Sequence, residues 1–264
     1  MRLPGRLAII AAVGAGALGV GVWASGGTWE DIRHWGQPRN VMSIGGHDVR
    51  VPHSTSAGAR LSPIIAASTT GSHTFLFEEA GEPTRYDPCV PVAWVHNPAG
   101  MPAGAEGLVE DAVDNIAQYT GLFFEFEGEV NEPVTFDRDL IQERYGERFA
   151  PVLVGWSDAS ATPDLGGSTA GLGGSSSVSG AYGDQRFLAA GVVILDREDF
   201  AELLATEAGQ GRAASIVRHE LAHVVGLGHV DDTTEVMHTE NLAAVSWGPG
   251  DRQALAIAGA GPCQ

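Results

Sequence analysis

The sequence contains no lysine, so all 15 of its basic side chains are arginine, against 33 aspartate and glutamate residues in a chain of 264. The formal net charge is −18. A surface of this sign repels phosphate backbones, which argues against nucleic acids as partners. The acidity fits a soluble extracellular protein and leaves two interpretations open. It confers solubility alone, or some of the carboxylates bind Ca²⁺.

Cysteine is scarce, with only Cys89 and Cys263 in the chain. An even count in a secreted chain favours one disulfide, which would tie the start of the main domain to the extreme C-terminus. Two unrelated buried thiols are the alternative.

A long apolar run occurs at the N-terminus, from Leu7 to Trp23, after the positive charges of Arg2 and Arg6. Small residues precede a potential cleavage point after Ala24. This pattern predicts a secretory signal peptide over residues 1–24. An uncleaved membrane anchor is the alternative, although the run is short for a spanning helix. The rest of the chain is therefore expected to be secreted, or anchored and facing outside, in an oxidising compartment.

No internal repeat is apparent, and the pattern along the chain changes near residue 72. Residues 25–71 are weakly patterned and rich in Gly, Ser, Pro and Thr, which predicts a linker or pro-segment that is largely unstructured. Residues 72–264 carry the regular patterns of one domain. We predict strands at 91–95, 122–126, 151–156 and 191–195, helices at 103–119, 199–204, 212–227 and 252–257, and a long surface loop at 166–183. This order indicates an α+β (α/β-like) fold in which a mixed, twisted sheet is backed by two long helices.

Residues 219–229 read HELAHVVGLGH. His219 and His223 are four residues apart, so on a helix both imidazoles lie on one face and reach one ion. Zinc binds neutral imidazole nitrogens, and three protein ligands leave a fourth position for water. Glu220 follows the first ligand and is placed to accept a proton from that water. Gly226 is able to end the helix with φ > 0, so that the chain turns back and presents His229 as the third ligand.

The motif from His219 to His229, followed by Met237, resembles the metzincin clan of zinc endopeptidases, whose extended zinc motif precedes a methionine turn. Within the clan the chain is most similar to small bacterial matrixin-type peptidases. The resemblance implies one catalytic Zn²⁺ held by three histidines, Glu220 as the general base, and Met237 as an apolar floor beneath the metal. It also implies a small irregular C-terminal subdomain after Gly226, with the substrate extended along an edge strand.

The chain also departs from that pattern. No histidine lies between His96 and His219, which puts the second, structural zinc of animal matrixins in doubt. Thr239 stands where related families place an additional tyrosine ligand, so no tyrosine switch is expected. No cysteine precedes Cys89. We favour a Cys89–Cys263 disulfide over a cysteine latency switch because both cysteines lie within residues 73–264, the part of the chain that the resemblance covers.

Several polar residues near the motif have alternative explanations. Asp231 and Asp232 either support a ligand imidazole or are solvated loop carboxylates, and a structural hydrogen bond is the simpler role for His238. The loop at 166–183 has Asp164 and Asp184 at its borders, and a Ca²⁺ ion bound there is conceivable, although no ligand spacing supports it.

These observations predict a secreted, monomeric zinc endopeptidase that acts on proteins or peptides and contacts a membrane only if residues 1–24 are retained. Two alternatives remain open. The chain is a non-catalytic zinc-binding module used for adhesion or recognition, or a zinc hydrolase of another amide such as a cell-wall crosslink.

Overall fold

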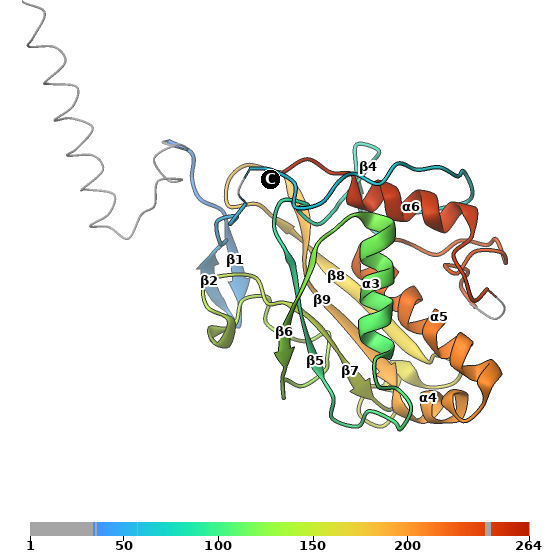
Figure 1. Ribbon diagram of the computed structural model, residues 1–264. Helices are drawn as coiled ribbons and strands as arrows, with labels where there is room; N and C mark the ends of the chain where they lie inside the picture. Colours follow the sequence, from blue (N-terminus) through green and yellow to red (C-terminus); the bar gives the residue numbers. More distant parts are fainter. Residues whose placement is uncertain (1–33, 35, 57, 241–243, 264) are drawn as a thin grey trace, which may run out of the picture.

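The computed structural model describes residues 34, 36–56, 58–240 and 244–263. The predicted signal peptide, residues 1–24, lies outside these described residues. The centre of the fold is one five-stranded sheet in the order β6-β5-β7-β9-β8, in which only β8 is antiparallel to its neighbour (Figure 1). The strands are β5 (Val92–Asn97), β6 (Phe124–Glu129), β7 (Val152–Ser157), β8 (Gly171–Ser179) and β9 (Arg186–Asp196).

Helices pack against the sheet and against one another. They are α3 (Leu108–Thr120), α4 (Arg197–Leu204), α5 (Glu207–Val224) and α6 (Pro249–Gly259), with 3₁₀ turns at Glu143–Tyr145 and Pro163–Leu165. The longest two, α3 and α5, lie side by side on one face of the sheet, and α6 packs on α3 (Figure 1). The predicted mixed sheet backed by two long helices is thus confirmed. Between α5 and α6 the described residues form only turns and isolated bridges.

The inner strands form because their residues are apolar on both faces. All six residues of β7 are buried, as are the last nine of β9, which is the pattern of parallel strands covered on both sides. The helix α3 buries only one face, through Val109, Ala112, Val113 and Ile116. This core supports α5, which carries the histidine motif.

The prediction of a long surface loop over 166–183 is wrong for half of that segment, because it contains the nine-residue edge strand β8. Its glycines allow a close approach to α5. A Cβ on Gly173 would stand 2.1 Å from the carbonyl oxygen of Glu220, and one on Gly171 would stand 2.8 Å from the Glu220 Cγ. Pairing with the apolar strand β9 and contact with α5 therefore outweigh the low intrinsic strand preference of glycine and serine.

Residues 25–71 were expected to be a largely unstructured linker or pro-segment, and their described part includes one short hairpin. Residues 41–50 form an antiparallel hairpin of β1 (Val41–Ile44) and β2 (His47–Arg50). The Nδ2 of Asn40 donates to the carbonyls of Gly180 and Gly183 at 2.8 and 2.7 Å, which docks this hairpin on the turn between β8 and β9. The hydrophobic pattern of the sequence is weak in this segment because contacts with distant parts of the chain hold the hairpin in place.

Residues 60–76, which we call the strap, run along α6 to the loop that follows α5 (Figure 1). The guanidinium of Arg60 donates to the carbonyls of Gly259 and Gly261 at 2.7 and 2.9 Å, at the C-terminal end of α6. At the other end of the helix, Thr69 Oγ1 donates to the carbonyl of Pro249 at 2.8 Å. Beyond the strap, β3 (Glu78–Glu79) pairs with β4 (Glu82–Pro83) in a short hairpin.

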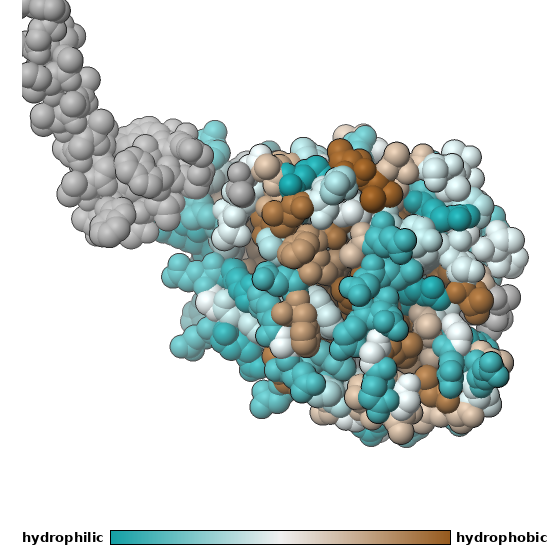
Figure 2. Space-filling view, viewed as in Figure 1, coloured by the Kyte–Doolittle hydropathy of each residue, from teal (hydrophilic) through white to brown (hydrophobic). Residues whose placement is uncertain are grey.

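Cys89 and Cys263 form a disulfide, with Cα atoms 5.3 Å apart and a sequence separation of 174 residues. The predicted pairing is confirmed, and the alternative of two unrelated thiols is excluded. Within the described ranges, no helix has the length and apolar character needed to span a membrane. The face that carries α3 is largely hydrophilic, with apolar side chains in separate spots (Figure 2).

Candidate metal centre

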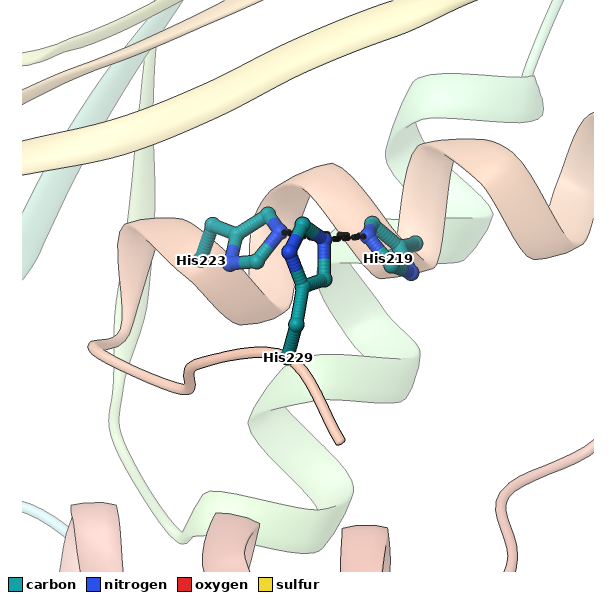
Figure 3. A group of neighbouring side chains, drawn as sticks. All are labelled: His219, His223 and His229. Carbon is teal, nitrogen blue, oxygen red and sulfur yellow. Dashed lines mark hydrogen bonds between the residues drawn. The ribbon is translucent and has the colours of Figure 1, made fainter. Parts of the chain in front are cut away.

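The three motif histidines converge on one point, as the sequence predicts (Figure 3). His219 and His223 project from the same face of α5. The helix ends at Val224. Two residues later Gly226 has a φ of 102°, in the region that favours glycine, and the chain turns back there to bring His229 opposite them. The Nε2 of His219 lies 3.0 Å from that of His229, and the Nε2 of His223 lies 3.1 Å from each of the others.

Hydrogen bonds to backbone carbonyls fix two of the rings. The Nδ1 of His219 lies 2.7 Å from the carbonyl oxygen of Val236, and the Nδ1 of His223 lies 2.7 Å from that of Leu227. A carbonyl only accepts, so each Nδ1 carries the proton. The Nε2 atoms of His219 and His223 therefore present lone pairs to the centre.

Burial keeps these imidazoles neutral. Desolvation, followed by the neighbouring histidines, lowers the pKa of His219 to about 3. Desolvation likewise lowers the pKa of His223 to about 4 and lowers that of the more exposed His229. Neutral imidazole is the form that coordinates a metal ion, so neither of these two buried rings has to release a proton before coordination.

The donor set fits Zn²⁺. Two nitrogen lone pairs without a proton between them repel at 3.1 Å, and a cation among the three rings converts that repulsion into coordination. Tetrahedral zinc with Zn–N bonds of about 2.0–2.1 Å places its ligands about 3.3 Å apart, close to the observed separations. Over the described part of the chain, this is the only group of three or more His, Cys, Asp or Glu residues whose ligand atoms all approach within 4.8 Å.

Glu220 is held where β8 crosses α5. Its side chain is 7% exposed and packs against the backbone of Gly171, at the start of the edge strand. Burial raises the pKa of Glu220 to about 8. A dication nearby would favour the ionised form again. A carboxyl group in such surroundings is suited to exchange a proton near neutral pH.

Below the histidines, two buried carboxylates join α6 to the turn that carries Met237. Met237 is 2% exposed, and Glu235 and Asp251 are each 1% exposed. Asp251 is the third residue of α6, because the helix begins at Pro249 with Gly248 as its N-cap. The Oδ2 of Asp251 accepts from the amides of Gly248 at 3.0 Å and Val236 at 2.6 Å.

Sequence reasoning missed the contacts of Glu235 and Asp251 with this turn and helix. The Oε1 and Oε2 atoms of Glu235 accept from the amides of Gly250 and Asp251, both at 2.9 Å, at the start of α6. An acidic residue beside the apolar pair Val236-Met237 was the available signal, because a carboxylate in a buried turn needs donors such as the free amides of a helix N-terminus.

Two other candidates near the motif, Asp232 and His238, have structural explanations. The Oδ1 of Asp232 accepts from the amide and hydroxyl of Thr234 at 3.0 and 2.7 Å, so it stabilises its own loop. These bonds lower the pKa of Asp232. The Nδ1 of His238 accepts from the amide of Glu240 at 3.2 Å.

The two carboxylates suggested for Ca²⁺ do not share a site. Asp164 precedes β8 and Asp184 follows it, so a nine-residue strand, about 30 Å long, separates them. One ion cannot bind both.

No protein-family model matches the chain, and no curated protein matches it in sequence. Among solved structures, the chain is similar to archaemetzincin from Methanopyrus kandleri, with 15% sequence identity and a TM-score of 0.38. The match covers 68% of this chain and 97% of that one. A TM-score at this level does not establish a common fold, so a function can be inferred only from the metal centre itself.

Proposed function

We propose that this protein is a secreted zinc endopeptidase of the metzincin type, related to the matrixins, with Zn²⁺ bound by His219, His223 and His229. The observation that carries the proposal is the convergence of three Nε2 atoms at 3.0–3.1 Å, two of them held as lone-pair donors by carbonyl bonds at their Nδ1 atoms. Zinc bound there would polarise a scissile carbonyl and lower the pKa of a water molecule.

Glu220 is the general base in this proposal. It accepts a proton from the attacking water and then donates it to the nitrogen of the leaving amine, so the same carboxyl serves both halves of the reaction. Its position one residue after the first ligand and its buried environment support this role. A module that only bound zinc would not need a carboxyl group here.

The edge strand β8 is the proposed platform for the substrate. It is the last strand of the sheet, so one side of its backbone has no partner strand among the described residues, and it passes directly over Glu220. An extended peptide that pairs with this edge would present its carbonyls to the metal centre. Met237 is proposed to form the apolar floor of the centre, in keeping with its burial beside Val236.

Secretion is supported by the Cys89–Cys263 disulfide, because such bonds persist in oxidising compartments. N-terminal sequencing of the protein recovered from culture medium checks this part of the proposal. A new N-terminus after Ala24 is expected, and retention of Met1 in a membrane fraction would indicate an anchored form.

The catalytic test is Glu220→Gln with Glu207→Gln as its matched control, since Glu207 is an exposed glutamate at the start of the same helix. Both variants and the wild type are assayed on casein and on cell-wall fragments, with and without a chelator. We expect Glu220→Gln to bind zinc normally and to lose about 10²–10⁴-fold in kcat, while the control is unaffected.

The outcomes separate the candidate functions. Cleavage of cell-wall fragments but not of casein would move the substrate class to cell-wall amides. Cleavage that survives the chelator, or that Glu220→Gln leaves unchanged, would refute the mechanism. Stoichiometric zinc with no hydrolysis of either substrate would favour the binding module.

A further inference from the structure

The carboxylate of Asp251 accepts hydrogen bonds from the two backbone amides that flank the Val236 carbonyl. Its Oδ2 accepts from the amide of Val236 at 2.6 Å, and its Oδ1 accepts from the amide of Met237 at 3.3 Å. Burial raises the pKa of Asp251 to about 6, which leaves the group mainly ionised at pH 7.5. An ionised acceptor makes stronger hydrogen bonds than a neutral one, so these bonds fix the Val236 backbone in a buried position.

The carbonyl of Val236 lies between those two amides and accepts the Nδ1 proton of His219 at 2.7 Å. The peptide group between Val236 and Met237 is therefore bonded at both ends. Its N–H donates to the Asp251 carboxylate, and its C=O accepts from the imidazole. Hydrogen bonds arranged in series polarise one another, so the carboxylate makes this carbonyl a better acceptor.

We propose that Asp251 is a positioning residue for the metal centre, which acts through the Val236–Met237 peptide to hold His219 as the Nδ1–H tautomer with Nε2 free to bind the metal. Carboxylates that bond directly to a ligand histidine have this effect in many zinc sites, and here one peptide group lies between the two. The inference rests on the proposed function only in taking zinc as the metal.

The chain provides its own control, because Glu235 is an equally buried carboxylate in the same contact between α6 and the turn. In the described hydrogen bonds, the carboxylate of Glu235 accepts only from amides of α6, those of Gly250 and Asp251. Loss of either carboxylate weakens the same interface, but only loss of Asp251 removes the acceptor behind the Val236 carbonyl. A second control is His223, whose Nδ1 bonds to Leu227, a residue that Asp251 does not contact in the described hydrogen bonds.

The experiment compares the wild type with Asp251→Asn and Glu235→Gln in the full chain. Asn keeps the side-chain size and one accepting oxygen, but it removes the charge and replaces the other oxygen by an NH₂ group that cannot accept from a backbone amide. Zinc affinity is measured by competition with a chromogenic chelator at pH 7.5. The histidine tautomers of the metal-free protein are read from long-range ¹H–¹⁵N NMR correlations, and thermal unfolding reports the stability of each variant.

We expect Asp251→Asn to weaken zinc binding about tenfold and to convert His219 to a mixture of tautomers, while His223 stays Nδ1-protonated. Glu235→Gln is expected to lower the unfolding temperature and to leave zinc affinity and both tautomers unchanged. Equal losses of zinc affinity in the two variants would overturn the proposal, as would an unchanged His219 tautomer in a folded Asp251→Asn protein.

A further comparison separates this inference from the proposed function. If the wild type fails to bind zinc stoichiometrically, the peptidase proposal fails, yet the tautomer of His219 in metal-free protein still tests the role of Asp251. If Asp251→Asn does not fold, Asp251→Glu is the alternative variant, because it retains the charge. The proposal then requires that His219 in Asp251→Glu still shows the Nδ1–H signal.

Discussion

At the residue scale, the closest packing of the site is between two backbones. Gly173 of β8 faces Glu220 of α5 so closely that any side chain would overlap with the helix backbone. The edge strand and the proposed base therefore have a fixed separation. This explains why a glycine-rich sequence forms a strand at this place, where larger residues would force the two elements apart.

Gly173→Ala should reduce both stability and activity. The added Cβ would stand 2.1 Å from the Glu220 carbonyl oxygen, so β8 or α5 must move, at a cost of about 1–3 kcal/mol. Gly211→Ala is the control, because that glycine lies in α5 with no atom within 4 Å of the added Cβ, and it should stabilise the protein by about 0.4–1 kcal/mol. Urea unfolding and peptide hydrolysis measure both effects. Equal behaviour of the two variants would contradict the close approach.

The motif residues were predictable because their geometry is local. The spacing of His219 and His223 fixes one helix face, and Gly226 supplies the turn that returns His229. The partners of these rings were not predictable in the same way. Val236 and Asp251 are distant in sequence from His219, and only the packed turn between α5 and α6 brings them together.

At the scale of elements, the hydrophobic periodicity of the sequence predicts the main strands and helices. Two segments, β8 and the strap, are instead held by contacts with distant residues, which periodicity does not reveal. The strand β8 has few apolar side chains and is defined by pairing with β9. The strap has no regular structure, and its polar groups bond to the ends of α6. Composition alone assigns both segments to loops, because the stabilising partner of each lies elsewhere in the chain.

The strap also reaches the third histidine. Phe75 pairs with Leu227, the amide of Gly228 donates to the carbonyl of Thr74 at 2.9 Å, and Thr74 Oγ1 donates to the carbonyl of His229 at 2.8 Å. This short ladder holds the chain that returns from Gly226. The strap is thus part of the metal-binding unit, although the sequence places most of it in a linker.

Thr74→Val should therefore weaken zinc binding by about two- to fivefold, a modest effect because the lost hydrogen bond is exposed. Thr69→Val is the matched control. It removes the same kind of hydroxyl-to-carbonyl bond from the same strap, but at α6, and should leave zinc affinity unchanged. Chelator competition measures both, and Thr74→Ser should recover wild-type affinity. A loss of affinity in Thr69→Val equal to that in Thr74→Val would mean that the strap acts only through general stability.

For the whole molecule, the disulfide and the strap act on the same helix. Cys263 follows α6 and is joined to Cys89, while Arg60 of the strap bonds to the C-terminal end of α6. The N-terminal end of α6 holds the turn beside the histidines through Asp251. The position of α6 therefore depends on covalent and polar contacts far from the metal centre, and the metal centre depends on the position of α6.

Replacement of both cysteines by alanine tests this dependence. Closing a loop of 174 residues is worth about 5 kcal/mol in the chain-entropy model, so the double variant should unfold at a markedly lower urea concentration. If the proposed zinc site is correct, zinc at a concentration 100-fold above its Kd should restore about 2.7 kcal/mol of that loss. Urea unfolding with and without zinc measures both quantities. An unfolding midpoint that matches the wild type without zinc would show that the contacts of α6 hold the chain ends without the covalent bond.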